Sequence, residues 1–237
     1  MSTFALIHSP ICGPETWRST GAALQARGYR AWIPGLEDDA AESLPLWQQN
    51  ADAIALAFRR SAMTEPAIWV AHSGAGFRLP AYRAAIAQPA KGYIFVDAGL
   101  PMDGLSQLDA MACEDAHFAR ELRVHLESGG VAPDWTDGAL REVLPDAAHR
   151  ALVLNGLRPR GLRYYTEQIY VSESWPDAPC AYLLFQEASY GMHARAAAAK
   201  GWQVRHIDAG HFHMLVDPDA VAEALIALAD QLSQACM

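Results

Sequence analysis

The chain has 237 residues, of which 51% are hydrophobic and 19% charged, and its formal net charge is −9 at pH 7. A chain of this length and apolar content can fill one well-packed core, so we expect a single domain over residues 1–237. The negative charge argues against nucleic acid or an acidic membrane surface as a partner, because both favour clustered Lys and Arg. A small-molecule substrate fits this composition better.

The cysteines are scattered along the chain without a CxxC pair, so their spacing indicates neither a disulfide framework nor a zinc site. They are Cys12, Cys113, Cys180 and Cys236. No apolar run reaches membrane-spanning length, and the start of the chain is too short and too uncharged for a signal peptide. We therefore expect a cytoplasmic protein with no membrane partner.

Short apolar runs alternate with longer stretches of helical period, which is typical of an α/β fold with a mostly parallel sheet flanked by helices. The expected strands cover residues 4–8, 29–33, 67–72, 92–97, 180–186 and 203–207. The expected helices of this core cover residues 17–27, 43–60, 74–88 and 220–232. Pro80 should kink the third of these helices or end its first turn. Asp217 followed by Pro218 predicts the start of the last one.

The alternation is interrupted over residues 99–179, which contain several helical patterns and no convincing strand. Helices are expected there at residues 109–126, 137–157 and 162–171, separated by Gly and Pro. A helical insertion between two core strands predicts a lid over a pocket. Its aromatic residues are candidate pocket walls: Phe118, Trp135, Tyr164, Tyr165, Tyr170 and Trp175.

Ser73 follows the apolar run of residues 68–71 and stands among small residues, in the sequence Ala71-His72-Ser73-Gly74-Ala75-Gly76. This is the pattern of a nucleophile elbow, a sharp turn from strand to helix that presents a serine for attack on a carbonyl. The pattern therefore predicts a serine-dependent enzyme.

Three landmarks make the chain resemble the α/β-hydrolase superfamily, in its short, lidded branch of esterases and hydroxynitrile-lyase-like enzymes. They are His8-Ser9-Pro10 followed by Trp17, the elbow around Ser73, and Gly210-His211-Phe212-His213 followed by Asp217-Pro218. The resemblance covers nearly the whole chain. It implies the α/β-hydrolase fold, a catalytic triad and no cofactor or metal.

A serine hydroxyl becomes a good nucleophile only when a base takes its proton, and histidine suits that role near neutral pH. The resemblance assigns this role to His211, because the histidine of the family motif directly follows a glycine. His213 is the competing candidate, expected instead to form a hydrogen bond within its own loop. His72 is expected to pack or line the pocket, and His8 to support the oxyanion loop.

The third member of a triad is a carboxylate that orients the imidazole. The place where most relatives carry it, after the strand at 180–186, holds no aspartate here, although Glu187 lies close by. Some relatives carry the acid after the strand that follows the nucleophile, where this chain has Asp97. We expect Asp97, with Glu187 as the alternative acid, and the order along the chain fits both.

An acyl-transfer site also needs two backbone N–H donors for the developing oxyanion. Gly74, directly after the nucleophile, should supply the first. The second should come from the loop after the first strand, but there Pro10 has no N–H to donate. Ile11 is the expected replacement.

These residues predict a serine hydrolase that cleaves an ester, thioester or lactone of a small, partly apolar molecule. Because Pro10 weakens the oxyanion site, a lyase or cyclase that uses Ser73 and His211 as an acid/base pair stays open. An acyltransferase is a further alternative, and a binding protein without catalysis is a weaker one. The sequence is compatible with a homo-oligomer.

Overall fold

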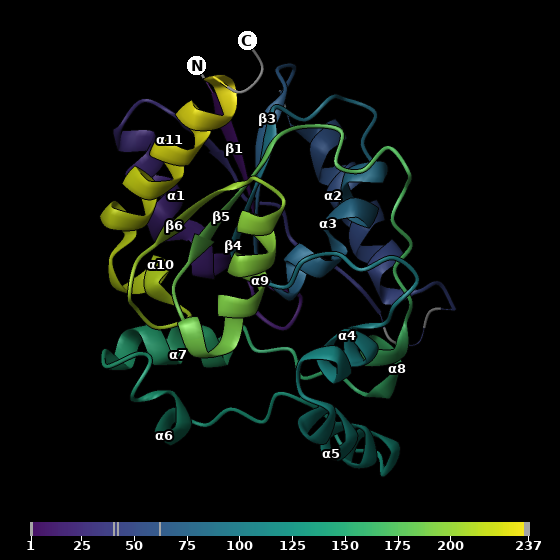
Figure 1. The fold of residues 1–237 in the computed structure, drawn as a ribbon. Coiled ribbons are helices and arrows are strands. Elements are labelled where there is room, and N and C mark those ends of the chain that lie inside the picture. Colours follow the sequence, from purple (N-terminus) through teal and green to yellow (C-terminus); the bar gives the residue numbers. More distant parts are fainter. Residues whose placement is uncertain (1, 40, 42, 62, 235–237) are drawn as a thin grey trace.

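The computed structural model describes residues 2–39, 41, 43–61 and 63–234, and its strands form one six-stranded parallel sheet (Figure 1). The strand order is β2-β1-β3-β4-β5-β6. The strands are β1 (Thr3–Ile7), β2 (Arg30–Trp32), β3 (Ala67–Ser73), β4 (Gly92–Ala98), β5 (Cys180–Leu184) and β6 (Gln203–His206). Each predicted strand is confirmed to within a residue or two at its ends.

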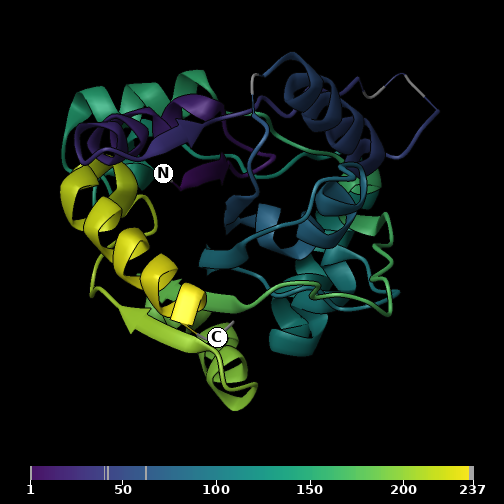
Figure 2. The same ribbon diagram turned by 90° about the horizontal axis from the view of Figure 1, so that it is seen from above.

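Helices cover both faces of the sheet, as Figure 2 shows from above. On one face lie α1 (Arg18–Ala26), which follows the short 3₁₀ turn η1 (Pro14–Trp17), and α11 (Pro218–Gln234). On the other face lie α2 (Leu46–Arg60), α3 (Gly74–Ala84) and α9 (Glu187–Ala199). The sheet is therefore buried on both sides, which explains why its central strands are apolar without alternation.

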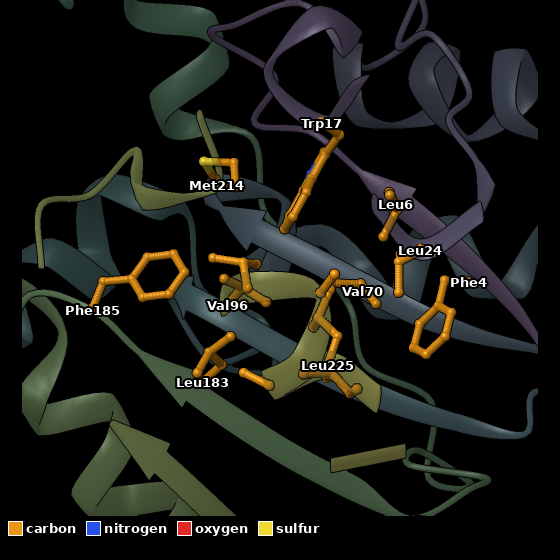
Figure 3. Packing of buried hydrophobic residues seen from close by; sticks show 14 of the residues in the cluster. Phe4, Leu6, Trp17, Leu24, Val70, Val96, Leu183, Phe185, Met214 and Leu225 are labelled. Atoms are coloured by element: carbon orange, nitrogen blue, oxygen red, sulfur yellow. The ribbon is translucent and has the colours of Figure 1, made fainter. Parts of the chain in front are cut away.

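Side chains of each central strand alternate between the two helical layers, because successive residues of a strand point to opposite faces. In β3, Ile68 and Val70 pack toward α1 and α11, whereas Trp69 and Ala71 pack toward α2 and α3. The packing of the first layer is shown in Figure 3, with Trp17 at the end of the cluster near Met214. This core holds the carboxyl ends of the strands in fixed positions.

The segment between β4 and β5 contains five helices and no strand, and these helices lie beyond the carboxyl ends of the strands (Figure 1). They are α4 (Gln107–Glu114), α5 (Ala116–Glu127), α6 (Asp137–Leu140), α7 (Ala147–Asn155) and α8 (Leu162–Thr166). We call residues 99–179 the insertion.

The predicted extents of the insertion helices are wrong. Residues 109–126 form two helices rather than one, because Asp115 is extended and its carboxylate caps α5, accepting the N–H groups of His117 and Phe118 at 2.9 Å. Residues 137–157 are likewise divided, because Asp146 caps a new helix, α7. The helix expected at 162–171 stops at residue 166, where the backbone becomes extended.

A further correction concerns α3. The helix α3 runs through Pro80 and ends at residue 84, so Pro80 does not end its first turn and the helix is shorter than the expected 74–88. The helix between β5 and β6 is α9. It begins directly after β5 and so brings residues 187–190 to the carboxyl edge of the sheet.

Among the described residues, none of the helices combines the length and the apolar character needed to cross a membrane. Cys12, Cys113 and Cys180 are free thiols, and Cys236 lies outside the described residues.

Candidate active site

Ser73 stands at the junction of β3 and α3 with a strained backbone, at φ 57° and ψ −130°. A residue other than glycine at positive φ costs on the order of 1–3 kcal/mol and persists only where the surroundings hold it. The neighbouring small residues allow this turn: a Cβ on Gly76 would lie 2.6 Å from the carbonyl oxygen of Gly99. The predicted elbow is therefore present as a sharp turn that places Ser73 at the carboxyl edge of the sheet.

Asp97 lies near the end of β4, the neighbouring strand, also at positive φ (43°), and is completely buried. Its Oδ1 accepts the backbone N–H groups of Phe185 and Gln186, each at 2.9 Å. Its Oδ2 lies 2.7 Å from Nδ1 of His211. The carboxylate is thus fixed by the end of β5 and directed at the imidazole.

Glu187, the alternative acid, lies in the first turn of α9 with a largely exposed side chain. Its carboxylate pairs with Arg195 of the same helix and folds over Gly191, where an added Cβ would approach within 2.2 Å of Oε1. The structure therefore brings Asp97, and not Glu187, to His211.

His211 lies in the loop between β6 and α10 (His213–Val216), and two aromatic rings pack against its imidazole. The ring of Tyr190 is stacked on it, with centroids 5.1 Å apart and 6° between the planes. The centre of the His72 ring lies 4.4 Å from the centre of the His211 ring, and the two planes are tilted by 33°. With Nδ1 bound to Asp97, the orientation of the imidazole is fixed by three neighbours.

The other histidines have distinct surroundings. His72 is buried and donates its Nε2–H to the carbonyl oxygen of His211 at 3.0 Å, and burial lowers its pKa well below the usual value. His213 packs edge-on against Phe185, and partial burial lowers its pKa. His8 is buried and bonded to the carbonyl of Ser9 at 2.8 Å, and burial lowers its pKa to about 4.

The loop after β1 is held by a buried ion pair that sequence reasoning missed. Arg160 of the insertion forms a two-pronged salt bridge with Asp38, at 2.6 and 2.9 Å, and both side chains are less than a tenth exposed. The same guanidinium donates to the carbonyl oxygen of Pro10, at 2.6 Å from Nη2. The N–H of Ile11 has no acceptor among the described residues, and Ile11 faces the cavity that contains Ser73.

This cavity, of about 1190 Å³, opens between the carboxyl edge of the sheet and the insertion. From the core it is lined by Ser9, Ile11, Ser73, Gly74, Tyr190 and His211. The insertion contributes mainly apolar side chains, together with Gln107, Tyr164 and the carboxylates of Glu114, Asp115, Glu121 and Asp134. Of the six aromatic residues expected as walls, four line it: Phe118, Trp135, Tyr164 and Tyr165. Tyr170 is mostly exposed and Trp175 packs against Tyr93 instead, so neither lines this cavity.

Tyr190 is the residue nearest the nucleophile that the sequence did not single out. Its hydroxyl lies 3.3 Å from Oγ of Ser73, and either oxygen can be the donor. The burial of its ring raises the pKa of this phenol, so the hydroxyl is protonated throughout the physiological range. Tyr190 lies in α9 and belongs to none of the sequence motifs, so no pattern in the sequence marked it.

Comparison with known proteins agrees with this architecture. The model of the "Alpha/beta hydrolase family" matches residues 5–224. A carbendazim-hydrolyzing esterase of Nocardioides sp. (strain SG-4G) is 24% identical, over 96% of this chain and all of that protein. Among solved structures, an extracellular alpha/beta-hydrolase from a Paenibacillus species has a TM-score of 0.76 at 18% identity, covering 96% of this chain and 99% of that one.

Polyneuridine aldehyde esterase has a TM-score of 0.73 at 14% identity and covers 97% of this chain and 99% of its own. At these identities the solved structures show a shared fold. The family match, which covers most of the chain, goes further. Together with the elbow at Ser73 and the parallel sheet that presents it, this match shows that the chain belongs to the alpha/beta hydrolase family.

Proposed function

We propose that the protein is a serine hydrolase that cleaves an ester, thioester or lactone of a small, partly apolar molecule. Ser73 is the nucleophile, His211 the base, and Asp97 the acid that orients His211. The contact of 2.7 Å between the buried Asp97 carboxylate and Nδ1 of His211 supports this assignment most strongly, because it leaves Nε2 of the imidazole free to take a proton. The two esterases named above support ester cleavage as the reaction.

The reaction proceeds in two displacements. Oγ of Ser73 attacks the carbonyl carbon while its proton moves to Nε2 of His211, and the imidazolium then protonates the departing alcohol or thiol. Water attacks the resulting acyl-enzyme with His211 again as base, releasing the acid and restoring the serine. Before the first attack, the Ser73 hydroxyl exchanges its bond with Tyr190 for one with His211.

The oxyanion is stabilised by the backbone N–H groups of Gly74 and Ile11. Gly74 begins α3, and Ile11 belongs to the loop that Arg160 holds through the carbonyl of Pro10. The insertion acts as the lid that closes the cavity and excludes water from Ser73. The predominantly apolar walls favour a substrate with an apolar acyl or alcohol group.

One observation favours a second candidate function. Pro10 stands where a further N–H donor would help an acyl transfer, so proton transfer by Ser73 and His211 without an acyl-enzyme, as in a lyase, demands less of this site. The two reactions differ in whether Ser73 becomes covalently modified.

A fluorophosphonate probe tests the proposal. The probe should label Ser73, identified by peptide mass spectrometry, and both Ser73→Ala and His211→Ala should abolish the labelling. His213→Ala is the matched control, because this neighbouring histidine lies against Phe185 and should leave labelling intact. A folded wild-type protein that resists the probe would refute the hydrolase and favour the lyase.

A further inference from the structure

Beside the nucleophile, the cavity contains two hydrogen-bond donors that come from the insertion. A Cβ on Gly74 would lie 3.3 Å from the hydroxyl of Tyr164 and 3.7 Å from the side-chain amide of Gln107. Because Gly74 has no side chain, the hydroxyl of Tyr164 and the amide of Gln107 lie close to the backbone beside the nucleophile. Both line the same cavity as Ser73.

The chemistry of Arg78 decides which way the Gln107 amide faces. The guanidinium of Arg78 hydrogen-bonds one atom of this amide, and because a guanidinium only donates, that atom is the oxygen Oε1. The NH₂ group is then the free end of the side chain. Among the described residues neither this NH₂ group nor the Tyr164 hydroxyl has a hydrogen-bond partner, so both are available to a ligand.

Arg78 itself carries a buried charge without a carboxylate partner. It is 1% exposed, and its other partners are the carbonyl oxygens of Gly74 and Tyr164, at 3.3 and 3.1 Å. Its guanidinium carbon lies 4.0 Å from the centre of the Tyr164 ring. Arg160 lies 5.5 Å from the same ring, but its charge is balanced by Asp38.

A buried charge is costly unless opposite charge or strong acceptors compensate it. Within the described residues, the salt bridges include none to Arg78, so its positive potential extends through Gln107 and Tyr164 toward the cavity. Neutral donors in front of a buried cation suit an oxygen that bears negative charge, and they repel another donor.

From this arrangement we propose that Gln107 and Tyr164, supported by Arg78, form a subsite for a second oxygen acceptor of the substrate, either an oxo group or a carboxylate close to the scissile carbonyl. The subsite rests on the proposed function, since it assigns the substrate class of the same hydrolase. The scissile carbonyl itself is bound by the backbone donors of Gly74 and Ile11. The preferred substrates are accordingly esters with such an oxygen rather than simple alkyl esters.

Three esters test the subsite: ethyl butanoate, ethyl 2-oxobutanoate and monoethyl succinate. In Tyr164→Phe, which keeps the ring against Arg78, and in Gln107→Leu, kcat/KM for the two oxygen-bearing esters relative to ethyl butanoate should fall about tenfold, the loss expected of one good hydrogen bond to a strongly polar acceptor. Comparing this ratio between variants cancels the different intrinsic reactivities of the esters. A loss on both oxygen-bearing esters supports any acceptor oxygen, and a loss confined to monoethyl succinate supports a carboxylate.

Tyr170→Phe is the control, because Tyr170 belongs to the insertion but is exposed and bonded to Gln168. It should leave all three rates unchanged. Equal losses on all three esters in Tyr164→Phe, or unchanged ratios in both subsite variants, would overturn the subsite.

The proposed function is tested separately, by probe labelling of Ser73 and by the wild-type rates on all three esters. If the wild-type protein cleaves none of the three and Ser73 is not labelled, the hydrolase proposal fails. Calorimetric titration with 2-oxobutanoate and with succinate then tests the subsite alone: Tyr164→Phe should weaken binding of at least one by the same factor, and unchanged affinity for both would overturn it.

Discussion

The phenol ring of Tyr190 lies parallel to the imidazole of His211, and its hydroxyl reaches Oγ of Ser73. One side chain thus contacts both the proposed nucleophile and the proposed base. The stacked ring supports the imidazole together with the ring of His72, whose centre lies 4.4 Å from that of His211. The hydroxyl, in contrast, competes with His211 for the serine.

Substitutions of Tyr190 separate these two effects. Tyr190→Phe keeps the ring and frees Ser73, so kcat for an ester should be unchanged or higher. Tyr190→Ala removes the stacking, and kcat should fall about 2- to 10-fold, the value expected for one aromatic pair. Steady-state kinetics on one ester checks both; an equal fall in the two variants would show that the hydroxyl takes part in the reaction.

Replacing the two candidate acids should have very different effects. Asp97→Asn keeps an oxygen for the N–H groups of Phe185 and Gln186 but cannot stabilise a protonated His211, so kcat should fall about 10²- to 10⁴-fold. Glu187→Gln breaks only an exposed pair with Arg195 and should leave kcat unchanged. The reverse ranking would move the acid to Glu187.

The buried pair of Asp38 and Arg160 should be important for stability. Asp38→Asn leaves the Arg160 charge buried without compensation, and the free energy of unfolding should fall by about 3–5 kcal/mol. Urea titration measures this change. Asp39→Asn is the neighbouring control on an exposed carboxylate, and a similar loss there would show that the ion pair is not the cause.

Stability should fall as the pH is lowered from 6.5 toward 4. His8 keeps a pKa of about 4 in the folded protein, because burial opposes its charged form, whereas the unfolded chain takes up the proton near pH 6.5. The unfolded state therefore binds more protons in this window, and stability rises with pH across it. The depressed pKa of His72 acts in the same direction.

The pKa difference of His8 between the unfolded and folded states lowers the free energy of unfolding by about 3 kcal/mol between pH 6.5 and 4. The urea midpoint of the wild-type protein should accordingly decrease between pH 6.5 and 4. His8→Gln cannot titrate, so its midpoint should depend less on pH. Parallel pH profiles for the two proteins would contradict this origin.

The strands β1, β3, β4 and β5 were predictable because burial on both faces makes each a short, mainly apolar run, bounded by polar or small residues. The insertion helices were predicted with wrong limits, because Asp115 and Asp146 each interrupt a helical pattern by capping a new helix. Such caps compete locally with helix continuation, and periodicity alone does not reveal which of the two wins.

The sequence also singled out Ser73, Asp97 and His211, because each lies at or beyond the end of a strand and belongs to a recognisable pattern. Tyr190, Gln107 and Tyr164 belong to no such pattern. The packing of α9, α4 and α8 brings them into the cavity that contains Ser73, so their position depends on tertiary contacts between distant segments. Arg78 was equally hidden, since nothing in the helical pattern of α3 shows that its guanidinium is buried.

Arg78 anchors two helices of the insertion to the core. It originates in the core helix α3 and binds both Gln107 of α4 and the backbone of Tyr164 in α8. Moving either helix away would take one acceptor from a buried guanidinium, so we expect α4 and α8 to stay docked while ligands enter and leave. Ligands then enter and leave the cavity beside α5, where Phe118 lines the cavity and is half exposed. Residues of α5 would thus govern how fast ligands arrive and depart, independently of how well they are held.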